Sequence, residues 1–332
     1  MTTPRALVTG GAGFIGSHMV DVLLAEGFEV RVIDNLATGH LDNLAHHRRE
    51  PRLAVEQVDM CDVPAGAPVF DGVECVFHFG GIGDIVPSIE RPVEYVRANV
   101  NGTVAMLEGS RRAGVRKFVY AASSSCYGLA DVPTAETAPI RPEYPYALSK
   151  YVGELSALHW AQVYGLPVVS IRMFNVYGPR VRTTGAYGAV FGVFLAQKAN
   201  GRPMTIVGDG SQRRDFVYVT DVARAFLMAA RSEYTGEVFN LGAGNPQSIH
   251  HLVELIGGPV VHVPKRPGEP ECTWADTGKI ARCLGWKPLV PFEEGVANML
   301  RNLGAWASAP VWTPESIAAA TGNWFTYLSK RA

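Results

Sequence analysis

The chain has 332 residues and a formal net charge of −1 at neutral pH, and hydrophobic residues make up 47% of it. A chain of this length and hydrophobicity can bury a large core, as one large domain or two ordinary ones, which excludes a disordered protein. The balanced charge offers no basic surface for nucleic acid or anionic lipid. The short run HHRRE at 46–50 is typical of a solvated loop or helix face.

The five cysteines, at positions 61, 75, 126, 272 and 283, include no Cys-x-x-Cys pair. Their odd number and irregular spacing argue against a disulfide framework and a structural zinc site, and favour a reducing compartment. No secretion signal is visible, and no apolar run reaches the roughly 18 residues that span a bilayer. We therefore expect a cytoplasmic protein with no metal and no membrane or nucleic-acid partner.

Apolar, β-branched segments alternate with helical ones in the first half of the chain, at 5–10, 29–35, 54–60, 73–81, 117–124 and 167–178. Without hairpin signals between them, this alternation predicts an α/β fold with a doubly wound parallel sheet of the Rossmann type. After about residue 176 the chain becomes irregular and rich in Gly, Arg and Pro, and a helix is predicted at 312–328 with Thr313 as its N-cap. We expect a nucleotide-binding domain at 1–175, rejoined by part of 211–240, and a smaller α/β substrate-binding lobe at 176–332.

A glycine-rich turn, VTGGAGFIG, joins the first predicted strand to the first helix and contains Gly10, Gly13 and Gly16. Glycine permits the tight turn and lets the backbone approach a pyrophosphate at the helix N-terminus. Asp34 ends the second strand 18 residues after Gly16, which matches a dinucleotide-binding pattern. Its carboxylate can accept the ribose hydroxyls of NAD but would repel a 2′-phosphate, so the sequence favours NAD over NADP.

Tyr146 and Lys150 stand four residues apart in YPYALSK, and would share one face of a helix. A phenol with a pKa near ~10 is a poor base at neutral pH, but a nearby ammonium and an oxidised nicotinamide would both lower that pKa. Such a tyrosine can take a proton from a sugar hydroxyl while hydride leaves the same carbon. The pattern is common by itself, and gains force from the glycine turn and from the serines at 123–125.

These motifs, in this order, resemble the extended short-chain dehydrogenases/reductases, specifically the nucleotide-sugar epimerase group typified by UDP-glucose 4-epimerase. The resemblance runs from Leu7 to about Trp286 and includes TGGAGFIGSH, VFHFGG, SSSCYG, YALSK, FNVYGPR and GDGSQRRDFVYVTD. It implies NAD as cofactor, a nucleotide sugar as substrate, and a homodimer paired through the helix that follows Tyr146. The implied reaction is transient oxidation at C4, rotation of the 4-keto sugar and re-reduction.

The resemblance also implies roles for individual residues. The catalytic residues would be Ser123, Tyr146 and Lys150. The cofactor residues would be Gly10, Gly13, Phe14, Ile15, Gly16, Asp34, Asn35, Asp59, Met60, Phe79, Gly80, Gly81, Asn99, Ala121, Tyr146, Lys150 and Met173, although Asp59 and Asn99 could instead serve a turn or cap. The substrate residues would be Ser123, Ser124, Ser125, Asn175, Arg182, Arg214, Arg266, Glu269 and Thr273.

Several substrate residues have a more specific expectation. Arg214 and Arg266 would hold the diphosphate, because a guanidinium suits phosphate oxygens, although a structural salt bridge is the alternative for each. Glu269 would contact a nucleotide ribose. Thr273 stands where UDP-glucose-restricted enzymes carry tyrosine, and so leaves room for a larger sugar. Arg182 resembles an arginine that binds the carboxylate in UDP-glucuronate 4-epimerases, and a surface arginine is the alternative.

Ser124 and Ser125 decide between reactions. Related dehydratases and decarboxylases carry an acid at one or both of these positions, because elimination needs a group that removes a carbon-bound proton. The serines therefore favour a 4-epimerase acting on a UDP-hexose or a UDP-hexuronate such as UDP-glucuronate. A ketoreductase or dehydrogenase of the same fold is the alternative, disfavoured because such reductases commonly use NADPH. A non-catalytic NAD-binding protein would have no need of the catalytic residues.

Overall fold

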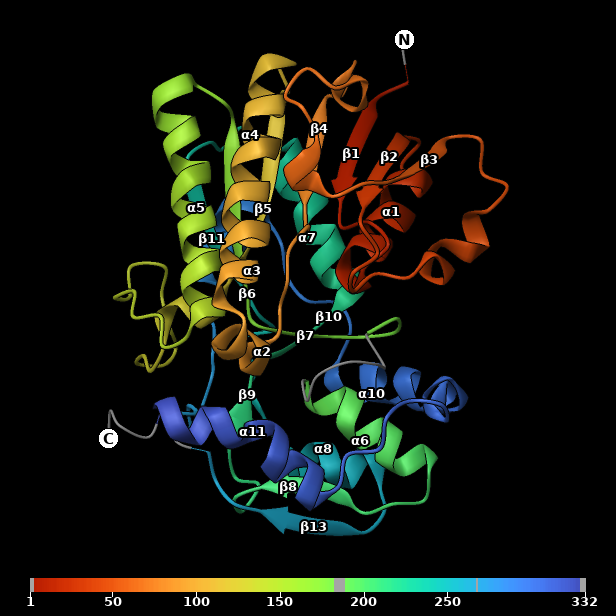
Figure 1. The fold of residues 1–332 in the computed structure, drawn as a ribbon, viewed down its shortest axis with the longest axis vertical. Helices are drawn as coiled ribbons and strands as arrows, with labels where there is room; N and C mark the ends of the chain where they lie inside the picture. The colour runs from red at the N-terminus through yellow and green to blue at the C-terminus, as the bar shows by residue number, and fades with distance from the viewer. Residues whose placement is uncertain (1–2, 182–188, 267, 329–332) are drawn as a thin grey trace.

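The computed structural model describes residues 3–181, 189–266 and 268–328. Within these residues a seven-stranded sheet forms the first domain, in the order β11-β6-β5-β4-β1-β2-β3, with every neighbouring pair parallel (Figure 1). Its strands are β1 (Arg5–Thr9), β2 (Glu29–Asp34), β3 (Leu53–Gln57), β4 (Cys75–His78), β5 (Lys117–Ser123), β6 (Val168–Met173) and β11 (Glu237–Leu241). The predicted doubly wound parallel sheet is confirmed.

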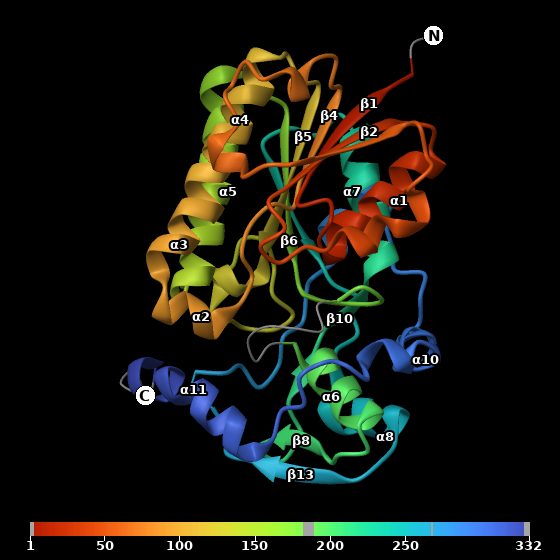
Figure 2. The same cartoon turned by 45° about the vertical axis from the view of Figure 1, so that its right-hand side comes forward.

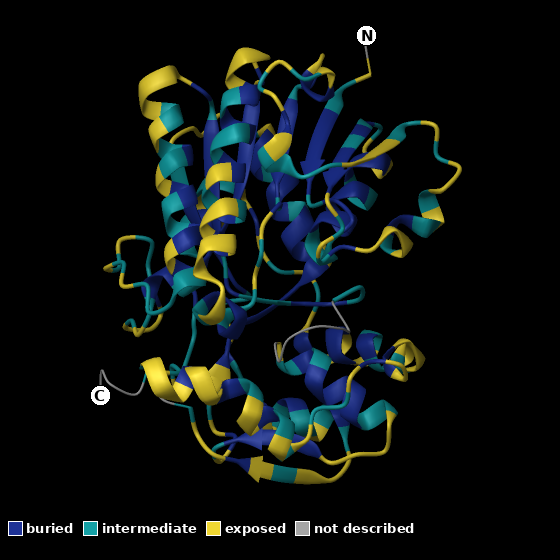
Figure 3. Ribbon diagram, viewed as in Figure 1, coloured by how far each residue is buried: buried dark blue, intermediate teal, exposed yellow. Residues whose placement is uncertain are grey.

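Helices cover both faces of the sheet (Figures 1 and 2). One face carries α1 (Phe14–Ala25) and α7 (Val219–Arg231), and the other carries α4 (Gly102–Arg112) and α5 (Pro145–Tyr164). Because side chains alternate along a strand, Ala6 and Val8 of β1 enter the core beneath α1 and α7, while Leu7 enters the core beneath α4 and α5. The sheet is therefore buried on both sides, as Figure 3 shows, which explains its apolar strands.

The second lobe lies below the sheet in Figure 1 and has its own core, which includes Phe194, Leu252 and Trp306. Its elements are α6 (Val190–Ala199), β8 (Met204–Val207), β9 (Arg213–Arg214), β12 (Gln247–Ser248), α8 (Ile249–Ile256), β13 (Val260–Val263), α10 (Phe292–Arg301) and α11 (Pro314–Leu328). Strand β8 pairs with β13 in parallel, and β9 pairs with β12 antiparallel. The first domain has two short helices on the side that faces the lobe, α2 (Ile85–Glu90) and α3 (Pro92–Val96).

The chain crosses between the two parts at Phe174. Phe174 N donates to Leu241 O in the large sheet, but the next amide, Asn175 N, donates to Asp215 O. The expectation of one strand over 167–178 was therefore wrong, because β7 (Asn175–Tyr177) changes partner and pairs with β10 (Phe216–Tyr218).

The chain later returns to the large sheet. Helix α7 packs beneath it, β11 forms its edge, and α9 (Gly278–Leu284) contacts both α7 and β11. Ile280 and Trp286 enter the same core. The division of the chain into a first domain at 1–175 and a lobe at 176–332 stays a prediction.

The two histidines of HHRRE form side-chain contacts that a solvated loop or helix face would lack. His46 Nε2 and His47 Nε2 lie 2.7 and 2.8 Å from Asp21 Oδ1 on α1, and Arg180 Nη2 lies 2.7 Å from Asp21 Oδ2. The Asp21 carboxylate is thus already neutralised by Arg180. The cluster fastens the segment after β2 and the segment after β7 to α1.

Candidate active site

The first pocket, of about 530 Å³, opens where β1, β2, β4 and β5 end. Its floor needs glycine: a Cβ at Gly10, whose φ is +67°, would lie 2.9 Å from Gly80 N, and a Cβ at Gly16 would lie 2.2 Å from Gly10 O. The close approach of these backbones leaves a cradle at the N-terminus of α1, where an anionic group is favoured. The glycine turn therefore forms the phosphate-binding shape that its spacing predicts.

Asp34 is fixed at the end of β2, beside the glycine turn. Its Oδ2 accepts a hydrogen bond from Ala12 N at 3.0 Å, and its Oδ1 accepts one from Leu36 N at 2.8 Å. Burial raises the pKa of Asp34, and the two backbone donors oppose that rise. A carboxylate held in this way suits hydroxyl donors of a ribose and disfavours a second anion.

All the predicted cofactor residues except Asn99 line this first pocket. Asn99 lies behind it: its Oδ1 accepts from Ile82 N at 2.7 Å, and its Nδ2 donates to Ile82 O at 3.0 Å and to Ser149 Oγ at 2.9 Å. Asn99 thus fastens the loop after β4 to α5. Sequence reasoning missed a similar support, Thr9, whose Oγ1 accepts from Gly80 N at 3.0 Å.

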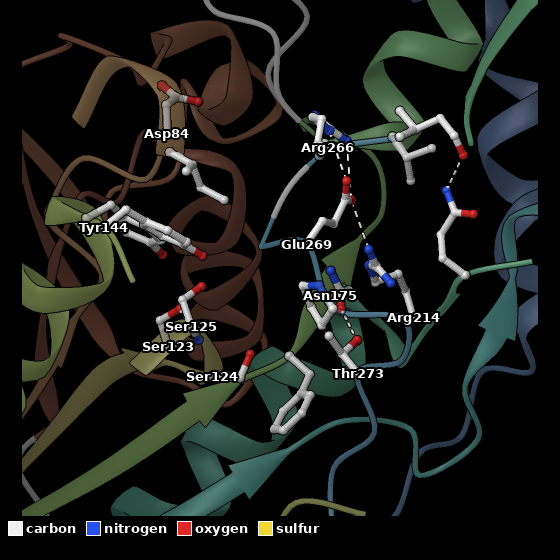
Figure 4. Close-up of a pocket in the computed structure, with 18 of the residues that line it drawn as sticks. Asp84, Ser123, Ser124, Ser125, Tyr144, Asn175, Arg214, Arg266, Glu269 and Thr273 are labelled. Atoms are coloured by element: carbon white, nitrogen blue, oxygen red, sulfur yellow. Dashed lines mark hydrogen bonds and ion pairs between the residues drawn. The ribbon is translucent and has the colours of Figure 1, made fainter. Parts of the chain in front are cut away.

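A second pocket, of about 460 Å³, lies between the sheet and the lobe, and it shares Tyr146 and Met173 with the first pocket. Figure 4 shows the residues that line it. The predicted substrate residues Ser123, Ser124, Ser125, Asn175, Arg214, Arg266, Glu269 and Thr273 all line this pocket. Arg182 lies outside the described residues.

The three predicted catalytic residues come from two elements. Ser123 ends β5, and Tyr146 and Lys150 lie one turn apart on α5, which confirms the expected helix. The Tyr146 side chain forms a hydrogen bond with Ser123. Lys150 Nζ lies 4.7 Å from the ring centroid of Tyr120, whose hydroxyl donates to Lys150 O at 3.0 Å. Tyr146 therefore lies where the two pockets join, with Ser123 lining the second pocket and Lys150 lining the first.

The surroundings of Tyr146 shift its pKa upwards. Burial raises the pKa of the phenol, the hydrogen bond with Ser123 lowers it, and the charge of Asp84 raises it. Ser123 is the side chain that lowers the pKa of Tyr146 in the protein alone, and the effect expected of Lys150 stays a prediction. Burial lowers the pKa of Lys150 itself to about 8, although the carboxylate of Glu154 favours its charged form.

Carboxylates line the second pocket even though Ser124 and Ser125 do not supply them. Asp84 and Glu143 both contribute to its wall. Asp84 precedes α2, and Figure 4 shows it near Tyr144, the residue before α5. The two acids come from segments far from the serines in the sequence, so the SSSCYG motif gave no signal for them.

The two predicted diphosphate arginines meet at one carboxylate. Glu269 Oε1 accepts from Arg214 Nη2 at 2.8 Å, and Glu269 Oε2 accepts from Arg266 Nε at 2.9 Å, as Figure 4 shows. Both arginines thus form the salt bridge that was the alternative for each, while they also line the pocket. Thr273 Oγ1 donates to Asn175 Oδ1 at 2.8 Å and so orients that amide.

A hydroxyl beside a tyrosine, with a lysine one helical turn along and a dinucleotide cradle next to them, is the arrangement of the short-chain dehydrogenases/reductases, and the added lobe is typical of their extended members. The chain belongs to the NAD dependent epimerase/dehydratase family, whose model matches residues 6–242. NAD is thus its cofactor, in agreement with the prediction.

Individual relatives include more than one kind of enzyme. The chain is 37% identical over 308 residues to a putative UDP-glucose 4-epimerase of Methanocaldococcus jannaschii, covering 89% of this chain and 98% of the relative. It is 32% identical to a dTDP-glucose 4,6-dehydratase of Streptomyces niveus, covering 96% and 99%. The solved UDP-N-acetylglucosamine 4-epimerase of Methanobrevibacter ruminantium, in complex with UDP-N-acetylmuramic acid, superposes with a TM-score of 0.86 at 30% identity, covering 92% and 99%.

Proposed function

We propose that this protein is an isomerase, an NAD-dependent nucleotide-sugar 4-epimerase that acts on a UDP-hexose or a UDP-hexuronate. The observation that carries the proposal is the position of Tyr146, which lines both pockets and bonds to Ser123. A proton acceptor at this junction faces a sugar in one pocket and a dinucleotide in the other. The relatives named as UDP-sugar 4-epimerases support the same assignment.

The first pocket fits NAD by shape and by charge. The glycines would hold the pyrophosphate, Asp34 the adenosine ribose, and Lys150 the nicotinamide ribose. When bound, NAD supplies a reversible acceptor for the hydride of the sugar carbon.

The side chains of the protein would handle the proton and the orientation of the sugar. Ser123 accepts or donates a hydrogen bond at the reacting hydroxyl, and Tyr146 Oη takes the proton from that hydroxyl. The Lys150 ammonium, one turn away, favours the phenolate during this transfer. After the keto sugar turns about its linkage to the diphosphate, the opposite face of C4 would lie towards the cofactor pocket, and Tyr146 would return the proton to the C4 oxygen.

The turning sugar needs a fixed point and free space. Arg214 and Arg266 at the pocket wall would provide the fixed point by holding the diphosphate. Thr273 provides space, because its small side chain turns towards Asn175. We therefore propose that hexoses with a large substituent fit as well as unsubstituted ones.

A second candidate function, dehydration, is favoured by one observation: Asp84 and Glu143 place carboxylates in the substrate pocket. A carboxylate could remove the proton at C5 that elimination requires. We prefer epimerisation because Ser124 and Ser125, directly after Ser123, carry no acid or base. In D2O a dehydratase would place solvent deuterium at C5 of its product, whereas a 4-epimerase would place none there.

The experiment that tests the proposed function is a panel of nucleotide sugars. Purified protein with NAD is incubated with UDP-glucose, UDP-N-acetylglucosamine, UDP-glucuronate and dTDP-glucose, and the products are identified by proton NMR. The 4-epimer of at least one UDP-sugar should form without accumulation of NADH. Steady NADH formation would instead identify a dehydrogenase, and no product from any UDP-sugar would reject the proposal.

We further propose a homodimer paired through α5. Leu148, Leu155 and Val163 of this helix are 49%, 46% and 53% exposed, and their spacing of seven and eight residues places them along one face. Light scattering should show a dimer, and Leu155→Asp should convert it to a monomer, whereas Leu289→Asp, at an exposed site in the lobe, should not. A monomeric wild-type protein at micromolar concentration would reject the dimer.

We also propose the cytoplasm as its location. The five cysteines, all within the described residues, form no disulfide. In the part of the chain that the structure describes, no helix has the length and the apolar composition to cross a bilayer. Fractionation of cells that express the protein would test this location.

A further inference from the structure

The C-terminal helix α11 reaches back from the lobe to the first domain. Asn323 Nδ2 donates to Glu90 Oε1, at the end of α2, at 3.0 Å, and the ring of Trp324 lies 6.1 Å from that of Tyr144. Figure 1 shows α11 lying beneath α2. Most of α11 is exposed, as Figure 3 shows, yet Trp324 is only 5% exposed. The helix therefore presents this one large ring inwards.

Trp324 lines the substrate pocket and contacts one of its arginines. The guanidinium carbon of Arg266 lies 5.4 Å from the ring centroid of Trp324, which is the distance of a cation–π contact. Arg266 also donates to Glu269 through Nε. The guanidinium thus has an aromatic ring against it and a carboxylate at its edge.

These two neighbours act differently when an anion arrives. Glu269 occupies the N–H groups with which Arg266 would bind a phosphate, so the carboxylate and the phosphate compete. An aromatic ring attracts the cation through its π face, and the N–H groups at the edge of the guanidinium stay available to oxygen acceptors. Of these two neighbours, the ring is therefore the one that can keep Arg266 in place while its edge exchanges Glu269 for a phosphate.

We propose that Trp324 is a positioning residue for Arg266, and that α11 completes the end of the substrate pocket that binds the diphosphate. The inference rests on the proposed function to the extent that the ligand is a nucleoside diphosphate. It adds to that function a residue and a helix outside every motif in the sequence that points to the family.

Binding of nucleoside diphosphates tests the inference without requiring turnover. The affinities of UDP, dTDP, GDP and ADP for the NAD-loaded protein are measured by calorimetry for the wild type, Trp324→Leu, Trp324→Phe and the control Tyr327→Leu. Tyr327 lies on the same helix and is 60% exposed. NAD affinity, measured alongside, reports whether each variant is folded.

We expect Trp324→Leu to weaken binding of the tightest diphosphate by about 5- to 30-fold, the range of a cation–π contact. Trp324→Phe, which keeps an aromatic face, should stay within about threefold of the wild type, and Tyr327→Leu should not change the affinity. With a substrate from the panel, Trp324→Leu should raise KM and spare kcat, because the contact serves binding.

The decisive comparison is made in the Arg266→Ala background. If Trp324 acts through Arg266, adding Trp324→Leu to Arg266→Ala should cause no further loss of affinity. An equal loss in both backgrounds, or no loss in the wild-type background, would overturn the inference while leaving the proposed function intact. If the wild type binds none of the four diphosphates, that result would reject both this inference and the proposed function.

Discussion

Glu154, which lies one turn beyond Lys150 on α5, forms a buried ion pair with Arg172 on β6. Arg172 Nη2 lies 2.5 Å from Glu154 Oε1, and the side chains of Arg172 and Glu154 are 6% and 1% exposed. Ser170 Oγ donates to Glu154 Oε2 at 2.8 Å, and Arg172 Nη1 donates to Tyr127 Oη at 2.8 Å. Because Tyr127 follows the three serines, this pair joins α5, β6 and the serine turn directly behind the catalytic residues.

Removal of one partner should therefore destabilise the protein strongly. Glu154→Ala leaves the Arg172 guanidinium buried without its carboxylate, which costs about 3–5 kcal/mol of the free energy of unfolding. Glu26→Ala, which removes an exposed partner of Arg231, should have little effect. Urea denaturation followed by circular dichroism measures both, and similar values for the two variants would contradict this assignment.

Tyr146→Phe should lose turnover and keep NAD. The phenylalanine ring preserves the contacts with Tyr95 and Tyr144 but offers no oxygen to take the proton, so kcat should fall by about 10²- to 10⁴-fold. Tyr144→Phe is the matched control, since its ring stacks on that of Tyr146 at 6.3 Å, and it should lose far less activity. Turnover of Tyr146→Phe near the wild-type rate would remove Tyr146 from the mechanism.

Two substitutions should shift the pKa of Tyr146 in opposite directions. Asp84→Asn removes a negative charge that raises this pKa, so the phenol should ionise at lower pH. Ser123→Ala removes a hydrogen bond that lowers it, so the phenol should ionise at higher pH.

Ultraviolet difference titration of each variant, with Tyr146→Phe as the reference, measures these shifts directly. Activity should rise with pH as the Tyr146 phenol loses its proton, because the phenolate is the form that accepts the substrate proton. This rise should therefore move to lower pH in Asp84→Asn and to higher pH in Ser123→Ala. Shifts of the same sign in both variants would show that these neighbours do not set the pKa.

Thr273→Tyr should separate substrates by size. A bulky ring at this position would occupy pocket space and remove the hydroxyl that orients Asn175, so activity on UDP-N-acetylglucosamine should fall by at least about tenfold relative to UDP-glucose. Thr273→Ser keeps the hydroxyl and the small size, and should keep the wild-type ratio of kcat/KM values. An equal loss for both sugars in Thr273→Tyr would show that Thr273 does not set the size of the pocket.

The sheet and the cofactor pocket were predictable from the sequence because their determinants are local. The spacing of Gly10, Gly13 and Gly16 fixes a turn, and the position of Asp34 at the end of the next strand places its carboxylate beside that turn. Tyr146 and Lys150 needed only a helix to share a face. In each case a few neighbouring residues determine the geometry.

The substrate pocket was less predictable because its contacts join distant segments. Glu269 was expected at a ribose, but it pairs with Arg214, 55 positions earlier in the chain. Asp84 reaches the pocket from the residue before α2, and Trp324 reaches it from α11. Packing of the lobe against the first domain brings these two segments together, and no local pattern encodes that packing. The end of the strand at Phe174 was unpredictable for the same reason, because it depends on hydrogen bonds to the distant residues Leu241 and Asp215.

The fate of the hydrogen on C4 of the sugar tests the central claim most directly. A UDP-sugar that the protein converts is prepared with deuterium at C4 and incubated with the NAD-loaded enzyme in ordinary water, and the product is examined by NMR and mass spectrometry. The account predicts the 4-epimer with its deuterium still on C4, because the same hydrogen leaves and returns within one active site. A product that has lost this deuterium to solvent, or one that has lost water, would contradict it.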